Sequence, residues 1–199
     1  MTIDRTQELQ WVKEGRVFYS TGAGVLTTPA AFQTDLVMQT PDFMVRAPAG
    51  VVIVPLRVQA SVEASNATGV FQALISACNN DPGIANMTAV TPVNTNTRYS
   101  TKGSSCTAYN TNAGNTGTAP TGVSDLLRVY VQPDVDSITG VAHFEQVVYS
   151  PLWGLGTPAI VGCETGTQAF LVYTANSTSG TGYILAAWAE FTYAEFYAA

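Results

Sequence analysis

The residues of this chain best suited to catalysis are its single histidine, His143, and its three cysteines, Cys78, Cys106 and Cys163. A cysteine thiolate beside a histidine is the nucleophile of many acyl-transfer enzymes, and clusters of these residues bind zinc. Neither chemistry is favoured here, because the cysteines are far apart in sequence and one histidine cannot form a two-histidine metal site. We expect reduced structural thiols and a histidine without a chemical role.

Acidic and amide side chains form two short groups that could bind calcium. Asp134 and Asp136 in QPDVDS, and the run Asn79-Asn80-Asp81, present the oxygen ligands that this ion prefers. The same residues are typical of turns, because their side chains hydrogen-bond to the nearby backbone, and we favour turns at both places. Glu190 and Glu195 have an odd spacing, so on a strand they lie on opposite faces and do not form the carboxylate pair of a glycosidase.

Other short motifs are equally unspecific. Asn66-Ala67-Thr68, Asn86-Met87-Thr88 and Asn176-Ser177-Thr178 match the N-glycan acceptor pattern, but the N-terminus MTIDRTQELQ lacks the basic and then apolar pattern of a signal peptide. No glycine-rich phosphate loop precedes a predicted helix, and no run approaches the roughly 18 apolar residues of a membrane helix. We therefore expect a soluble, unprocessed protein that is not an enzyme and has no catalytic, cofactor or metal site.

Composition limits the partners of the chain. Its net charge of −6 and scattered basic residues argue against binding a nucleic-acid backbone through the body of the domain. Only 11% of the residues are charged and 46% are hydrophobic, which is a thin charged shell for a monomer. Either some uncharged surface is buried against other chains, or Ser, Thr, Asn and Gln supply the solvated surface.

The clearest structural signal is the run Val51–Glu63, which predicts a long strand with one buried face. Its even positions are all apolar, whereas the odd positions turn polar from Arg57 onward; the apolar set is Val52, Val54, Leu56, Val58, Ala60 and Val62. The turn Pro48-Ala49-Gly50 separates this strand from another β-favouring run, Phe43-Met44-Val45-Arg46.

Several further segments also favour strands over helices. Gly69–Cys78 is expected to form a hairpin with Val51–Glu63, and the acid-free stretch Pro82–Ser124 reads as a long surface excursion. Gly182–Tyr197 suits a helix by its alanines, but Tyr183, Leu185, Phe191 and Tyr193 recur with period two, so we favour a strand. The other predicted strands are Phe32–Gln39, the weak Thr97–Ser100 and Cys106–Tyr109, Leu126–Gln132, Ala142–Tyr149 and Gln168–Thr174.

The N-terminal segment differs from the rest. Residues Asp4 to Lys13 predict a short helix that ends at Gly15, and Val17-Phe18-Tyr19 predicts a short strand. We expect residues 1–29 to form an arm that acts between subunits and becomes ordered only on assembly, packed on its own or a neighbouring domain. Residues 30–199 are expected to form a single domain that folds without it.

About eight strands without intervening helices are the content of two Greek keys, a jelly roll. On the Phe43–Glu63 unit around Pro48-Ala49-Gly50 and the closing Gly182–Phe196 strand, the chain resembles the single jelly-roll capsid proteins of icosahedral viruses, in particular those of bacteriophages. The resemblance implies an all-β, eight-stranded jelly-roll β-sandwich with an N-terminal arm. Phe32–Ala47, Val51–Glu63 and Gly69–Cys78 would be its first three strands, and Gly182–Phe196 its last, beside the first.

The resemblance also implies a function. The chain would be a shell subunit in the virion, assembled in the host cytoplasm by contacts with copies of itself and with other capsid proteins. Its arm would not package the genome directly, because Arg5, Lys13 and Arg16 are balanced by Asp4, Glu8 and Glu14; the inner side of such a shell would face a membrane vesicle or other proteins.

The alternative is an oligomeric receptor- or sugar-binding jelly roll that decorates or attaches a virus, with Trp153, Tyr109 or Tyr99 as stacking platforms. A cupin-like enzyme would need a histidine-rich metal cluster, which a single histidine cannot supply.

Overall fold

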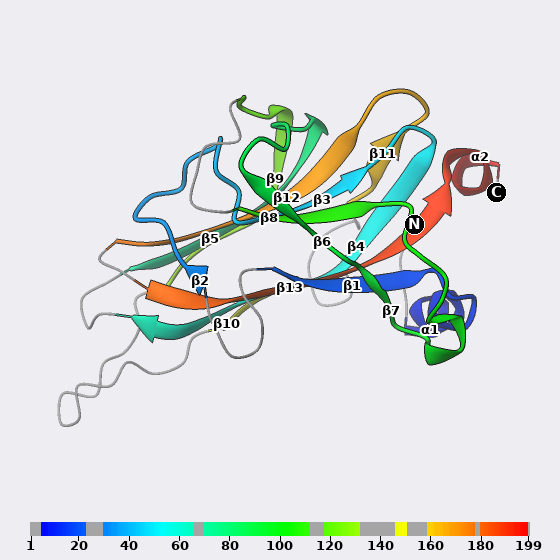
Figure 1. Cartoon of the computed structure of the whole chain (residues 1–199), viewed down its shortest axis with the longest axis horizontal. Helices are drawn as coiled ribbons and strands as arrows, with labels where there is room; N and C mark the ends of the chain where they lie inside the picture. Colours follow the sequence, from blue (N-terminus) through cyan, green and yellow to red (C-terminus); the bar gives the residue numbers. More distant parts are fainter. Residues whose placement is uncertain are drawn as a thin grey trace.

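The computed structural model describes residues 5–22, 30–65, 70–111, 118–131, 146–150, 159–177 and 180–198. Most of these residues lie in strands, which form two antiparallel sheets packed in a sandwich-like arrangement (Figure 1). The prediction of a β-rich sandwich is confirmed.

The first sheet is seven-stranded and contains both the first and the last strand of the fold. Its path is β10-β4-β13-β1-β7, with β11 paired to β4 and β2 paired to β13. The bounds of these strands are β1 (Val17–Gly22), β2 (Ala30–Ala31), β4 (Val51–Ser65), β7 (Val93–Asn94), β10 (Gln146–Tyr149), β11 (Val161–Cys163) and β13 (Gly180–Thr192).

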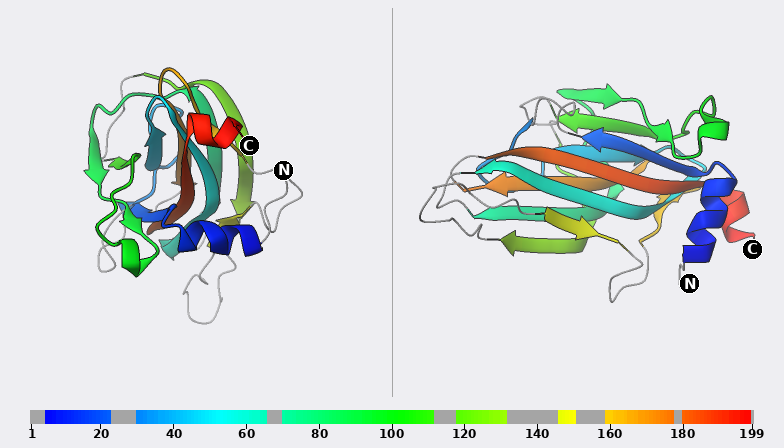
Figure 2. Two further views of the ribbon diagram at one scale, coloured as in Figure 1. Left: turned by 90° about the vertical axis from the view of Figure 1, so that its right-hand side faces the viewer. Right: turned by 90° about the horizontal axis from the view of Figure 1, so that it is seen from below.

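The second sheet is six-stranded, in the order β6-β8-β3-β12-β5-β9. Its strands are β3 (Phe43–Ala47), β5 (Phe71–Asn80), β6 (Met87–Val90), β8 (Thr107–Thr111), β9 (Thr121–Val131) and β12 (Gln168–Asn176). The helical elements are α1 (Arg5–Lys13), the single 3₁₀ turn η1 (Thr97–Tyr99) and α2 (Tyr193–Tyr197). Both α1 and α2 lie at one end of the sandwich (Figure 2).

The main core fills the space between the sheets. Phe170 of β12 and Trp188 of β13 join the two layers edge to face, with ring centroids 6.2 Å apart. The core strands also bury residues whose side chains point away from the main core, because successive side chains point to opposite faces of a sheet. Outside the six-stranded sheet these form a second cluster of Met44, Leu74, Cys78, Ala169, Leu171 and Tyr173.

A bulge in β4 creates a third cluster outside the seven-stranded sheet. Ala187 pairs with Arg57 and Trp188 with Pro55, so Leu56 has no residue opposite it. The extra residue shifts the alternation of side chains by one, so even-numbered side chains point to opposite faces of the sheet before and after the bulge. Val58 and Ala60 face the main core, whereas Val54 and Leu56 face outward with Trp11, Val17 and Ala189. The prediction that all even positions of Val51–Glu63 share one buried face is therefore wrong.

The most consequential difference from the sequence prediction is the place of β1. Val17–Gly22, which we assigned to an arm, pairs with β13 along its whole length and with β7 on its other side. Phe18 is 1% exposed in the main core, and Val17 is buried in the outer cluster. The sandwich thus includes residues that precede the expected boundary at residue 30, because a strand too short to be stable alone is held by its neighbours.

Three other predicted elements differ because tertiary contacts outweigh local pattern. β4 and β5 belong to different sheets, so they do not form a hairpin. Phe32–Gln39 is not a strand: Phe32 packs in the main core and Leu36 on the outer cluster of the six-stranded sheet, so the segment crosses between layers. Thr97–Ser100 contains η1, because the Asn96 side chain caps a 3₁₀ turn.

The C-terminal prediction is confirmed as a strand through Thr192 and is wrong beyond it. The Thr192 hydroxyl accepts a hydrogen bond from the backbone N–H of Glu195 at 3.2 Å and starts α2. A threonine N-cap of this kind favours a helix over a continued strand.

We expect Phe18→Ala to lower the free energy of unfolding by about 3–5 kcal/mol, because it leaves a cavity at the centre of the main core. The matched control is Tyr19→Ala, which changes the next residue of β1 on the half-buried outer face and should cost clearly less. Chemical denaturation measures both. Equal losses would contradict the inner position of Phe18.

Candidate functional site at the helical end

The outer apolar cluster is covered by α1. Trp11, 6% exposed, packs on Val17, Val54, Leu56 and Ala189 of the seven-stranded sheet. Its indole also meets the Phe191 ring edge to face at 5.1 Å. Half-buried Val12 also packs on this cluster, and most other residues of α1 are polar, so Trp11 and Val12 make the apolar contacts of the helix with the sheet.

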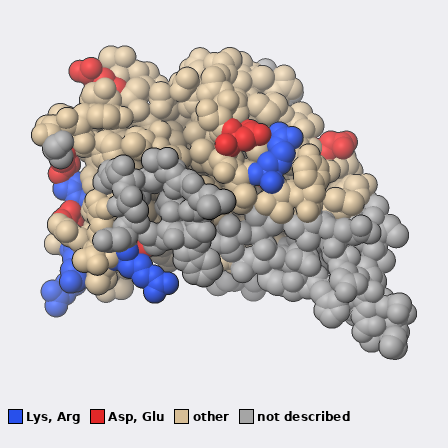
Figure 3. Space-filling view, turned by 180° about the vertical axis from the view of Figure 1, so that it is seen from behind, with Lys and Arg blue, Asp and Glu red and all other residues tan. Residues whose placement is uncertain are grey.

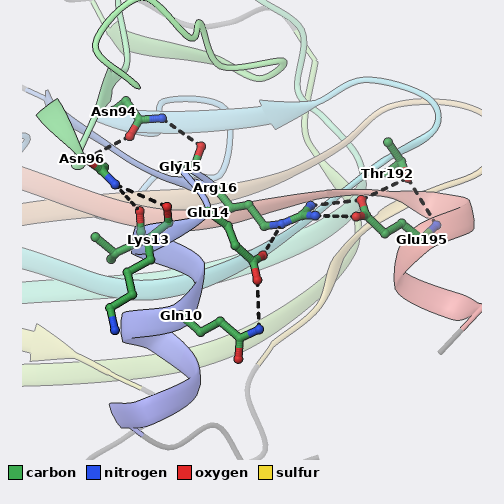
Figure 4. Close-up of polar contacts among 10 residues, drawn as sticks. Gln10, Lys13, Glu14, Gly15, Arg16, Asn94, Asn96, Thr192 and Glu195 are labelled. Carbon is green, nitrogen blue, oxygen red and sulfur yellow. Dashed lines mark hydrogen bonds and ion pairs between the residues drawn. The ribbon is translucent and has the colours of Figure 1, made fainter. Parts of the chain in front are cut away.

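The C-terminal end of α1 is capped by the segment 94–99 (Figure 4). The Asn96 amide donates to the carbonyls of Val12, at 3.0 Å, and Lys13, at 3.4 Å, and the Asn94 amide donates to that of Gly15 at 2.9 Å. Gly15 has φ +68°, and a Cβ atom there would lie 2.6 Å from the Tyr99 ring. Only glycine allows both this turn and the ring contact.

Arg16 connects the two terminal helices (Figure 4). Its guanidinium donates to Glu14 at 2.7 Å and, as a bidentate pair, to both carboxylate oxygens of Glu195 in α2. The same group lies 5.3 Å from the Phe191 ring centroid. The Arg16 hydrogen bond is the main cause of the lowered pKa of Glu195, whereas the lowered pKa of Glu14 is due first to Gln10 and then to Arg16.

These residues border an open pocket of about 350 Å³. Its walls combine aromatic rings, two amides and the Arg16 cluster; they are Gln7, Gln10, Trp11, Glu14, Arg16, Phe191, Glu195 and Phe196. Its two carboxylates, Glu14 and Glu195, accept hydrogen bonds from the Arg16 guanidinium.

Two buried carboxylates serve the fold. Glu190, 8% exposed, accepts hydrogen bonds from the Ser104 hydroxyl, the Ser105 N–H at 2.9 Å and the Trp188 indole at 2.8 Å. It thereby ties the segment before β8 to β13. Asp42 accepts from the N–H and hydroxyl of Thr174, at 2.5 and 2.9 Å.

Burial raises the pKa of Asp42 to about 7, against the opposing effect of the Thr174 hydrogen bonds. No Lys or Arg side chain among the described residues forms an ion pair with this carboxyl. Desolvation without a cation destabilises the ionised form.

The cysteines are placed as structural thiols. Cys78 and Cys106 are buried, and burial raises the pKa of the Cys78 thiol to about 11 and that of Cys106 still further. Cys163 is half-buried and its thiol donates to the Thr165 carbonyl at 2.9 Å. His143, the other half of any Cys–His pair, lies outside the described residues.

Asn79 and Asn80 are the last two residues of β5, so the turn predicted for Asn79-Asn80-Asp81 is wrong for them, and Asp81 after the strand is already paired. Asp81 accepts from Arg46 at 2.5 Å and from the Gly83 N–H at 2.8 Å. Across the described ranges, no group of three His, Cys, Asp or Glu residues could hold a metal ion, and no helix is long and apolar enough to cross a membrane. Asp134 and Asp136 lie outside these ranges.

The remaining predicted sites are scattered. Tyr99 is 41% exposed beside α1, whereas Tyr109 packs on the outer cluster of the six-stranded sheet, and Trp153 lies outside the described residues. Glu190 and Glu195 have separate partners, but the spacing argument does not apply to them, because Glu195 lies in α2 and not on the strand. Of the glycan motifs, Asn86 is exposed and Asn176 is buried, while Asn66 is not described.

We expect Asp42→Asn to remove a pH dependence of stability. The folded state holds the Asp42 proton more tightly than the unfolded chain, so its contribution to the free energy of unfolding falls as the pH rises from about 4 to about 7. At pH 8 the variant should be more stable than the wild type by up to about 4 kcal/mol, and at pH 4 the two should agree. The measurement is denaturant unfolding at both pH values, with exposed Asp35→Asn as the control. If the free energies of unfolding of Asp42→Asn and the wild type change with pH in parallel, Asp42 is not the cause of the pH dependence.

We expect Arg16→Gln to loosen both terminal helices with little change in global stability, because exposed ion pairs contribute about 1 kcal/mol or less. Hydrogen exchange should accelerate in α1 and α2 and stay unchanged in β12. The control is Arg57→Gln, whose guanidinium donates a hydrogen bond to Gln59 at 2.7 Å. Unchanged exchange in α2 would show that Arg16 does not hold it.

Comparison with known protein families, with curated proteins and with solved structures found no match to this chain. The functional interpretation therefore depends on the strand pairing, the surface and the helical end.

Proposed function

We propose that this protein is a structural shell subunit of an icosahedral virion, and that its sandwich is a jelly roll. The observation that carries the proposal is the nested pairing of its strands. Consider β1, β3, β4, β5, β9, β10, β12 and β13 in chain order: the first pairs with the last, the second with the seventh, the third with the sixth and the fourth with the fifth.

Such nesting is what results when one long antiparallel hairpin is rolled into a barrel. The outermost and third pairs, β1 with β13 and β4 with β10, lie in the seven-stranded sheet, and the other two lie in the six-stranded sheet. This alternation is expected of two Greek keys. The first strand of the proposed jelly roll is then β1, not Phe32–Ala47 as the resemblance implied, and β13 still lies beside the first strand.

The surface supports a protein that contacts other chains. Charged residues make up 11% of the sequence, and wide uncharged areas are visible on the face in Figure 3. Large apolar side chains are also exposed at several places on the described surface; they are Leu9, Val37, Met38, Ile84, Val93, Tyr99, Tyr130, Ile160 and Tyr197. Exposed apolar side chains are common interface material when neighbours cover them.

The test is the assembly state of the purified chain, by sedimentation velocity and negative-stain electron microscopy over a range of concentration and salt. We expect capsomers or closed shells. A strictly monomeric protein under all conditions would refute the shell function. A small closed oligomer that binds glycans would favour the receptor-binding alternative.

We expect deletion of residues 1–14 to leave a folded sandwich, because the deletion keeps β1 and Phe18. The shortened protein should no longer assemble, because the deletion removes α1. Deletion of residues 1–29 removes an inner strand and should abolish folding, which revises the expectation drawn from the sequence. Circular dichroism and sedimentation measure folding and assembly, with deletion of residues 1–4 as the control that keeps α1. Normal assembly without α1 would contradict a role for this helix.

A further inference from the structure

We propose that the exposed cations of α1 and the adjoining η1 segment form a contact surface for the acidic surface of a second copy of this chain. We call this surface the basic strip and define it by Arg5, Lys13, Arg98 and Lys102. The inference rests on the proposed function, since it names one contact by which subunits would assemble.

The basic strip contains the cations that the fold does not use. All eight Lys and Arg residues of the chain fall within the described ranges. Half of them have side-chain partners: Arg16 binds Glu14 and Glu195, Arg46 binds Asp81, Arg57 binds Gln59 and Arg128 lies near Asp125. The four residues of the basic strip are exposed and have no side-chain partner among the described residues.

The four cations are gathered by the fold. Arg5, Leu9 and Lys13 are four residues apart, so they share one face of α1, away from buried Trp11. In Figure 4 the Lys13 ammonium points away from the Arg16 cluster. The Asn96 and Tyr99 contacts with the end of α1 hold the η1 segment there, which places Arg98 and Lys102 near Lys13.

Apolar side chains accompany these charges. Leu9 is 53% exposed between Arg5 and Lys13, and Tyr99 is 41% exposed beside Arg98. Charges that guide an approach and apolar groups that are buried on contact are the usual components of a protein interface.

Charge complementarity identifies a second copy as the occupant. The chain carries −6, and without the four cations of the basic strip the remainder carries −10 (−6 minus 4). Two of the acidic residues in this remainder, Asp42 and Glu190, are buried. Asp35 and Glu164 are exposed carboxylates without a cation partner in the described part, and they are available to a neighbouring copy. A polyanion such as nucleic acid would instead be repelled by the net charge of the chain.

The same argument determines the type of contact. The basic strip cannot pair with itself across a two-fold axis, because like charges would meet. The basic strip of one copy must therefore lie on a different surface of the next copy. Where such a contact is heterologous, its repetition generates a ring if the rotation closes. The segment between β2 and β3, with Asp35, lies at the opposite end of the sandwich from α1, which leaves it accessible to a neighbour (Figure 1).

The test compares two charge-reversed variants of the full chain. Lys13→Glu with Arg98→Glu reverses the basic strip, and Arg57→Glu with Arg128→Glu makes the same change of charge on exposed strand residues elsewhere. We expect the basic-strip variant to need at least about tenfold more protein to assemble, because like charges would face each other. The control should stay within about twofold of the wild type, and wild-type assembly should weaken with added salt. Circular dichroism and melting verify the fold of each variant.

Three outcomes would overturn the inference. The first is normal assembly of the basic-strip variant, and the second is equal impairment of the control, which would show general repulsion. The third is loss of binding to anionic phosphatidylglycerol vesicles, or to DNA, with assembly unchanged. If the wild type itself never assembles, the proposed function fails together with this inference. If the wild type assembles and one of the three outcomes is found, only this inference fails.

Discussion

The structure depends most on the pairing of β13 with β4 and β1. The last strand of the chain lies in the middle of the seven-stranded sheet and pairs with β4 over almost its whole length, while β1 pairs along its other edge. The sheet therefore cannot close until the C-terminal segment is present. Because such contacts join residues distant in sequence, forming them costs chain entropy before the contacts stabilise the sheet. The helical end is built on this pairing.

The bulge at Leu56 determines what happens outside that sheet. It lies in the longest strand and turns Val54 and Leu56 away from the main core. Trp11 of α1 packs on this apolar patch and shields it from solvent. The polar composition of α1 would not hold the helix there alone. One unpaired residue in β4 therefore explains why the N-terminal helix lies on this sheet, beside α2.

The sequence could predict elements whose stability is read from local alternation, such as β4, β5 and β12, and the short helix before Gly15. It could not predict the bulge, because a residue without an opposite neighbour leaves the apolar alternation unchanged. It also could not place β1 in the sheet or separate β4 from β5, since both depend on which distant strand is the partner. The Arg16–Glu195 pair was missed for the same reason: its members are 179 residues apart and meet only through β1 and β13.

The use of charge connects this fold to the proposed function. The buried carboxylates Asp42 and Glu190 accept hydrogen bonds from neighbouring strands and segments. Arg16 is used within the chain to join the terminal helices. What remains is a set of exposed cations on a helix whose inner face is already occupied by the sandwich. A helix anchored on one side and basic on the other has a fixed position from which to meet an acidic neighbour, so the contacts that complete the fold also orient the surface proposed for assembly.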